Sequence, residues 1–153
     1  MLESRSMKKI LAIIVLNLFL ISNGFADLKG ILEMQLFIEP LKAKAKICGV
    51  KRENLETSAR YILSNSKIKL VKSHPISIYI NSNIGENEGC YANTSIDVYK
   101  IMKDPGSNNW GRFYYYSDGG IASGGKGADF GDPYISSFEQ LLKKLVVEHS
   151  NDN

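Results

Sequence analysis

Histidine and cysteine, on which metal and nucleophilic sites most often depend, are scarce in this sequence. The 153 residues include two histidines, His74 and His149, and two cysteines, Cys48 and Cys90. Neither histidine has the spacing to the cysteines that a zinc site requires. The G-x-S-x-G pattern around a hydrolase nucleophile is also absent. We therefore predict no metal site, no cofactor and no catalytic residue.

Long apolar runs are scarce too, and the one clear example lies near the N-terminus. Ile10 to Ile21 is apolar except for Asn17, with two lysines before it and small residues after it. This is the pattern of a secretory signal peptide, and the run is too short to span a bilayer. We predict that residues 1–26 are a cleaved signal and that residues 27–153 are one exported domain, periplasmic or secreted, with no membrane span. A buried N-terminal helix or an uncleaved anchor is the alternative.

Net charge is small once the predicted signal is set aside. The whole chain has 19 basic and 16 acidic residues. Removing Arg5, Lys8, Lys9 and Glu3 leaves 16 basic and 15 acidic residues, a net charge of +1. Binding to nucleic acid depends on many cations that face the phosphates. The composition therefore gives no reason to expect a nucleic-acid partner.

The cysteine pair has a different meaning in an exported chain. An even number of cysteines in an oxidising compartment predicts a disulfide. Two thiols alone would supply too few ligands for a metal. We therefore predict one bond between Cys48 and Cys90. It would contribute roughly 3–4 kcal/mol of stability in the chain-entropy model.

Most of the chain shows the alternation typical of strands. The cleanest case is Ile76 to Ser82, where Ile76, Ile78 and Ile80 share one face and Tyr79 lies on the other. The further predicted strands are residues 31–40, 67–71, 90–102 and 110–117. A short helix is the alternative for residues 31–40, and "LKAKAKI" (41–47) is a possible extension of that strand.

Two segments have helical periodicity. Leu55, Ala59, Ile62 and Leu63 recur on one face after Cys48. The C-terminal stripe consists of Phe138, Leu141, Leu142, Leu145 and Val146, and Asp132 with Pro133 is predicted to begin that helix.

This order of elements predicts an α+β fold with two layers. Short turns join the later strands, which should pair as antiparallel neighbours. Each predicted helix has a single apolar stripe to bury. We expect a mainly antiparallel sheet of about four to five strands, covered on one face by two helices and tied by one disulfide.

Several of these features together resemble a loose group of small exported bacterial proteins of unassigned function. They are "ICGV" before an amphipathic helix, the alternating "ISIYIN", a second "GC" opening a long strand, an aromatic strand and a final helix. The resemblance covers most of residues 27–153. It implies export, a disulfide and a compact α+β fold, and it brings no activity.

The aromatic strand "WGRFYYYS" is the candidate binding element. Alternation predicts that Trp110, Arg112, Tyr114 and Tyr116 face solvent as a ladder, while the intervening aromatics pack beneath the helices. Such a ladder is suited to stacking on a glycan or a peptide. Packing between strands explains the same residues without a ligand, and this is the reading that we favour.

The stretch "GGIASGGKG" comes within one residue of the phosphate-binding pattern G-x-x-x-x-G-K-[ST]. Gly127 stands where the pattern needs a hydroxyl to bind Mg²⁺. A helix beginning only at Asp132 would leave no helix N-terminus beside Lys126. We therefore interpret the stretch as a mobile connection from the aromatic strand to the last helix.

These observations favour a non-catalytic exported protein, a small binding or envelope-accessory domain whose partner is an envelope protein, a peptide or a glycan. The alternative is an exported hydrolase that uses His74 with nearby acids. A weak calcium site is a further possibility, because carboxylate oxygens suit this ion. We favour roles in turns and in one helix cap for the acids concerned, which are Asp97, Asp104, Asp118, Asp129 and Asp132.

Overall fold

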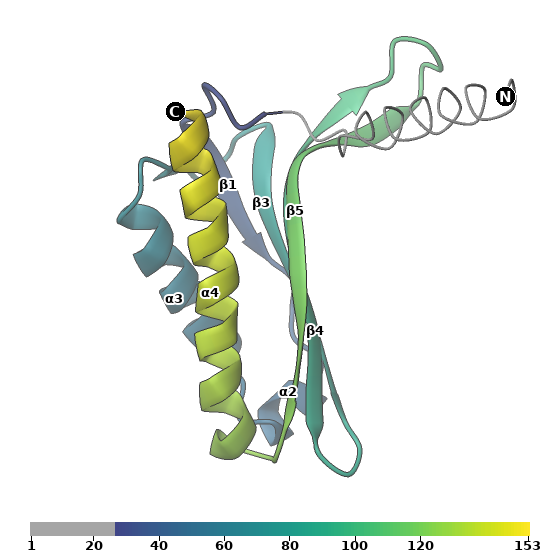
Figure 1. Cartoon of the computed structure of the whole chain (residues 1–153). Helices are drawn as coiled ribbons and strands as arrows, with labels where there is room; N and C mark the ends of the chain where they lie inside the picture. The colour runs from purple at the N-terminus through teal and green to yellow at the C-terminus, as the bar shows by residue number, and fades with distance from the viewer. Residues whose placement is uncertain (1–26) are drawn as a thin grey trace, which may run out of the picture.

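The computed structural model describes residues 27–153, which form one five-stranded sheet with helices on one side (Figure 1). The predicted signal, residues 1–26, lies outside the described residues. The strand order is β2-β1-β3-β4-β5. The strands are β1 (Glu33–Ile38), β2 (Lys69–Leu70), β3 (Ile76–Glu86), β4 (Cys90–Lys103) and β5 (Trp110–Gly124). The predicted α+β class is confirmed.

The direction of the strands divides the sheet into two parts. β1 runs parallel to both β2 and β3, whereas β3, β4 and β5 are consecutive antiparallel neighbours. A parallel pair needs a crossover between its strands, and α3 (Arg52–Ser64) lies in the connection from β1 to β2. The prediction of a mainly antiparallel sheet is therefore correct for β3 to β5 and incomplete for β1.

Two helices, α3 and α4 (Ala128–Asp152), cover one face of the sheet (Figure 1). Both predicted apolar stripes face the core. On α3 the buried residues are Leu55, Ala59 and Leu63. On α4 they include Phe138, Leu142 and Leu145. Along β3 and β4, the even-numbered residues from Ile78 to Val98 lie on the covered face. The core includes Met34, Ile38, Ile78, Ile80, Ile84, Ile96, Val98, Phe138, Leu142 and Leu145.

The disulfide holds the base of the two layers together. Cys48 and Cys90 are bonded, with their Cα atoms 5.8 Å apart, as predicted. Beside them Gly49 adopts φ +73°, and a Cβ atom there would lie 2.5 Å from the carbonyl oxygen of Gly127. Only glycine permits this approach between the disulfide loop and the start of α4.

The segment "LKAKAKI" is not a strand extension as predicted. Lys44–Ile47 form a short helix, α2, in which Ala45 alone is buried. Alanine and lysine are strong helix formers, and one turn needs only one apolar contact. The alternation of lysine and alanine is therefore not evidence for a strand here, because both residues also favour a helix.

The glycine stretch is not a mobile connection either. Gly119 to Gly124 belong to β5 and pair in register with Cys90 to Ser95. The long partner strand β4 offers a continuous ladder, and its pairing outweighs the weak strand preference of glycine.

The C-terminal helix also begins earlier than predicted, at Ala128 instead of Asp132, and includes Pro133 near its start.

The C-terminal end of α4 clasps the N-terminal end of the described chain. His149 is fully buried, and its Nε2 lies 2.6 Å from the carbonyl oxygen of Ile31. The Asp152 carboxylate accepts from the N–H of Leu28, and the Asn153 side-chain carbonyl from that of Gly30. Within residues 27–153, no helix is long and apolar enough to cross a membrane.

Candidate binding face

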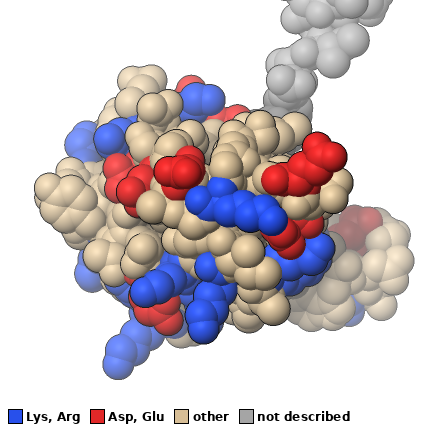
Figure 2. All heavy atoms as spheres, turned by 90° about the horizontal axis from the view of Figure 1, so that it is seen from below, with Lys and Arg blue, Asp and Glu red and all other residues tan. Residues whose placement is uncertain are grey.

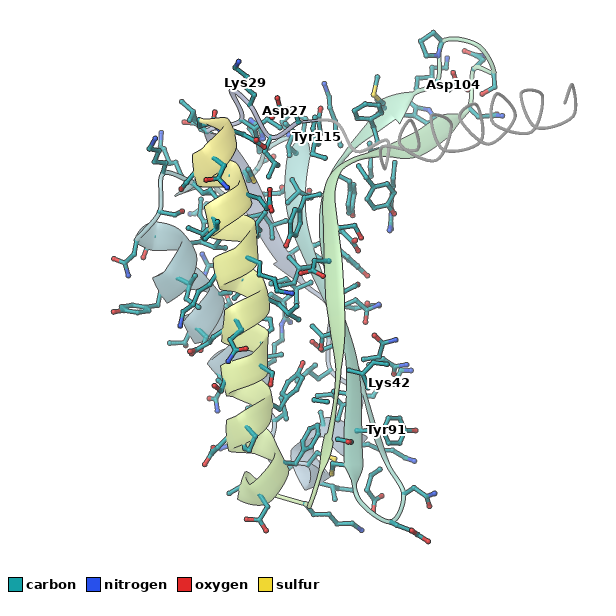
Figure 3. All side chains as sticks on the ribbon, viewed as in Figure 1. Asp27, Lys29, Lys42, Tyr91, Asp104 and Tyr115 are labelled. Carbon is teal, nitrogen blue, oxygen red and sulfur yellow. A yellow bond between two sulfur atoms is a disulfide. The ribbon has the colours of Figure 1, made fainter. Side chains whose placement is uncertain are left out.

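The second face of the sheet has no described helix over it (Figure 1). Alternation along the strands decides which side chains lie there. In Figure 3, Tyr91 of β4 lies on this open face, whereas Tyr115 of β5 lies on the helix side.

Four aromatic rings from four strands form a continuous row on the open face. Phe37 of β1 stacks on Tyr79 of β3 at 5.5 Å between ring centroids. Tyr79 lies 6.0 Å from Tyr99 of β4, and Tyr99 lies 5.7 Å from Tyr114 of β5. Spacings of this size are favourable for aromatic pairs. We call Phe37, Tyr79, Tyr99 and Tyr114 the aromatic row.

Strand register explains why these four residues meet. Phe37 is directly opposite Tyr79, and Tyr99 is directly opposite Tyr114. Tyr79 is opposite Asp97, so Tyr99 is its diagonal neighbour two residues along β4. Direct and diagonal neighbours on one face are within reach of large side chains.

A cation and an anion fix the centre of the row. The Arg112 guanidinium lies 4.7 Å from the Tyr99 ring centroid and 5.4 Å from that of Tyr79. A hydrogen bond with Tyr114 raises the pKa of Arg112 above its ordinary value. The Tyr79 hydroxyl donates to the Glu39 carboxylate at 2.7 Å, and this bond raises the pKa of Tyr79. Arg112 therefore places a permanent positive charge over the middle rings, where Tyr99 is only 7 % exposed. Phe37 and Tyr114, at the two ends of the row, are more open than Tyr99.

Hydrogen-bonding side chains surround the row. The Ser117 hydroxyl donates to Asp97 at 2.6 Å, and the Gln35 side-chain amide donates to the Ser77 hydroxyl at 2.7 Å. Asp97 is next to the row on β4, and Ser77 is next to it on β3. Both sides of the row therefore have groups that bind hydroxyls or amides.

A β-bulge changes the face that the aromatic strand was predicted to present. Val98 pairs with Tyr116 but Tyr99 pairs with Tyr114, which leaves Tyr115 without a partner. Tyr116 therefore lies on the helix side, where burial raises its pKa and Asp118 and Glu148 lie close by. The predicted face is wrong for Tyr116, while Arg112 and Tyr114 lie on the open face as predicted.

The sequence prediction missed three members of the row, Phe37, Tyr79 and Tyr99. Tyr79 was placed on the second face of its strand, which is correct, but the strand order was needed to align the three residues. Beyond the end of β3, β4 and β5 extend from the body as a two-stranded arm (Figure 1). Trp110, at the end of this arm, is 72 % exposed.

Several hollows border the sheet. One of about 320 Å³ lies on the arm, beside Met102, Lys103 and Phe113. Another of about 210 Å³ lies between β5 and α4, beside Gly120, Leu141 and neighbouring residues. Charge around the base of the molecule is mixed, with lysine and arginine interspersed among aspartate and glutamate (Figure 2).

The residues considered for catalysis or phosphate binding have local roles. His74 accepts from the N–H of Ile76 through Nδ1, within a turn. Lys126 of the phosphate-like pattern pairs with Glu86, and it follows an antiparallel edge strand. Across residues 27–153, no group of three or more histidine, cysteine, aspartate or glutamate side chains is placed to hold a metal.

No protein-family model matches this sequence. No curated protein matches it either. Among solved structures, a minor lipoprotein from Acinetobacter baumannii is similar over 79 % of this chain and 94 % of its own, with 12 % sequence identity and a TM-score of 0.34. A TM-score of this size does not establish a shared fold.

Proposed function

We propose that this chain is an exported, non-catalytic binding domain that holds a glycan on the open face of its sheet. The observation that carries the proposal is the aromatic row, which has no described helix over it. The formed disulfide and the signal pattern of residues 7–26 support export.

A glycan has the chemistry that this face offers. The C–H faces of a sugar ring pack on aromatic rings, and its hydroxyls need donors and acceptors at the ring edge. Phe37 is 48 % exposed at one end of the row. Asp97, Ser117 and Gln35 supply polar atoms beside it. A peptide would use the same surface, and binding of peptides alone would contradict the glycan proposal.

The test compares row variants with a matched surface tyrosine. Phe37→Ser and Tyr114→Ser should each reduce affinity for a glycan found on a binding array by about tenfold, the usual effect of losing one aromatic contact. Tyr61→Ser is the control, because Tyr61 is 70 % exposed on α3, away from the open face. Titration calorimetry measures the affinities.

Two results would contradict the proposal. Either the array shows no glycan above background, or Tyr61→Ser weakens binding as much as the row variants do. Export is tested separately by determining the N-terminus of the protein recovered from the periplasm or the medium, which should be Asp27. The hydrolase alternative gains no supporting observation from the described residues, since His74 is held in its turn.

A further inference from the structure

The two-stranded arm extends beyond the aromatic row and touches it through Arg112 at its base. We define the arm as residues Lys100 to Phe113. Pairing of β3 with β4 ends at Ile76 and Lys100, and beyond this point β4 and β5 pair only with each other. The arm extends away from the body on the side opposite the helices (Figure 1). A two-stranded ribbon in water is marginally stable, so an apolar one needs a partner.

Apolar side chains are concentrated on this arm to an unusual degree. The described chain has eleven exposed large hydrophobic residues, and four of them lie on the arm. Ile101 and Trp110 lie on one face by alternation, and Met102 and Phe113 lie on the other. Phe113 is supported by the edge of Tyr115 at 5.4 Å, which fixes its position at the base. Both faces of the arm are therefore apolar.

The arm is also positively charged. It contains Lys100, Lys103 and Arg112 and a single acid, Asp104, for a net charge of 3 − 1 = +2. Asp104 accepts from the Ser107 hydroxyl and the N–H of Gly106, bonds that fix the turn at the tip. The arm thus differs from the base of the molecule, where both signs are mixed (Figure 2).

We propose that the arm docks in the interfacial layer of an anionic lipid bilayer. A protein groove would cover one face of a ribbon, whereas a lipid interface surrounds both faces at once. Tryptophan prefers this layer, and lysine and arginine beside it attract anionic headgroups. Trp110 pairs with Lys103 beside the turn, so the tryptophan and one cation lie together at the end of the arm, while Lys100 and Arg112 lie at its base. The docking is tested apart from the glycan proposal, because the arm residues changed below, Phe113 and Lys103, are not members of the aromatic row.

Trp110 is the only tryptophan of the chain and reports on the arm directly. The test uses unreduced protein recovered after export, with its N-terminus determined, so that every variant shares the same ends. Vesicles of phosphatidylcholine containing phosphatidylglycerol should shift the tryptophan emission to shorter wavelength and protect it from a water-soluble quencher. Vesicles of phosphatidylcholine alone should give a much weaker response.

Variants separate the arm from other exposed residues. Phe113→Ser should weaken vesicle binding about tenfold, and Lys103→Gln about fivefold, as expected for one interfacial side chain and one cation. Ile121→Ser is the matched apolar control, since Ile121 is 83 % exposed on β5 outside the arm. Lys143→Gln, on α4, is the matched charge control. Retention of the disulfide and of the circular dichroism spectrum shows that each variant folds.

Three results would overturn the proposal. The first is an unchanged Trp110 emission with anionic vesicles. The second is an equal loss of binding in Ile121→Ser or in Phe37→Ser, which would place the lipid contact elsewhere. The third is capture of a protein by the arm in the absence of any vesicle binding.

Discussion

The two faces of the sheet show what this chain buries for itself and what it leaves uncovered. On the covered face, Ile78, Ile80 and Ile96 are fully buried beneath α3 and α4. On the open face, the aligned positions are aromatic or polar, and Phe37 is about half exposed. Aliphatic residues fill a core without needing partners for polar atoms, whereas tyrosine joins an apolar body to a hydroxyl. The difference indicates that the open face keeps contact with water, which the proposed glycan site requires.

Truncation of one phenylalanine on each face is the largest test of this comparison. Phe138→Ala should lower the free energy of unfolding by about 3–5 kcal/mol, because Phe138 is 1 % exposed and its loss leaves a cavity in the core. Phe37→Ala should cost below about 1.5 kcal/mol, since only one stacking contact is lost. Urea denaturation measures both. Equal costs would show that the open face is part of the structural core.

Loss of the buried Tyr134 hydroxyl on the covered face should have an intermediate effect on the free energy of unfolding. The Tyr134 hydroxyl is hydrogen bonded to Thr94 at 2.8 Å and to Ser82 at 2.7 Å. Tyr134→Phe should cost about 1–2 kcal/mol at neutral pH, because Thr94 and Ser82 lose a buried partner. Denaturation of both proteins in urea at neutral pH measures this cost.

The same residue predicts a dependence on alkaline pH. Burial raises the pKa of Tyr134 above its ordinary value, so the folded state favours the neutral phenol. Its contribution is therefore complete below pH ~10 and is lost as the pH rises from there through the raised pKa. The free energy of unfolding should fall across this range, and less steeply in Tyr134→Phe. Parallel curves for the two proteins would refute this assignment.

The smallest effect is expected at Arg112 on the open face. Arg112→Ala should lower the free energy of unfolding by about 0.5–1 kcal/mol, the value of an exposed cation over an aromatic ring. Lys103→Ala, a nearby exposed cation, should change it by less than about 0.5 kcal/mol. Chemical shifts of the Tyr99 ring in NMR spectra report whether the guanidinium has left. If Lys103→Ala lowered the free energy of unfolding more than Arg112→Ala does, the stabilising role given to Arg112 would be wrong.

Much of the covered face was predictable because its signals are local. The alternation of Ile76, Ile78 and Ile80 and the helical spacing of Leu55 and Ala59 depend only on near neighbours. The cysteine pair and the class of fold followed from the same kind of information. Each of these predictions is confirmed.

The open face was harder to predict because it depends on pairing across strands. The aromatic row requires the order β1-β3-β4-β5 and a register that aligns Phe37 with Tyr79. A single unpaired residue, Tyr115, moved Tyr116 to the other face, and no local pattern marks a bulge. The glycine stretch failed for a similar reason, because only β4 makes it a strand.

The clasp between α4 and residues 28–31 has a consequence for the order of events during synthesis. Of the two helices that cover the sheet, α4 follows all five strands in the chain, and its His149 reaches back to Ile31 near the start of β1. The apolar face of the sheet therefore has only α3 over it until α4 has been made. If the chain crosses a membrane with its N-terminus leading, the domain cannot complete its core until α4 has crossed. Until then the chain stays incompletely folded, which is the state that passage requires.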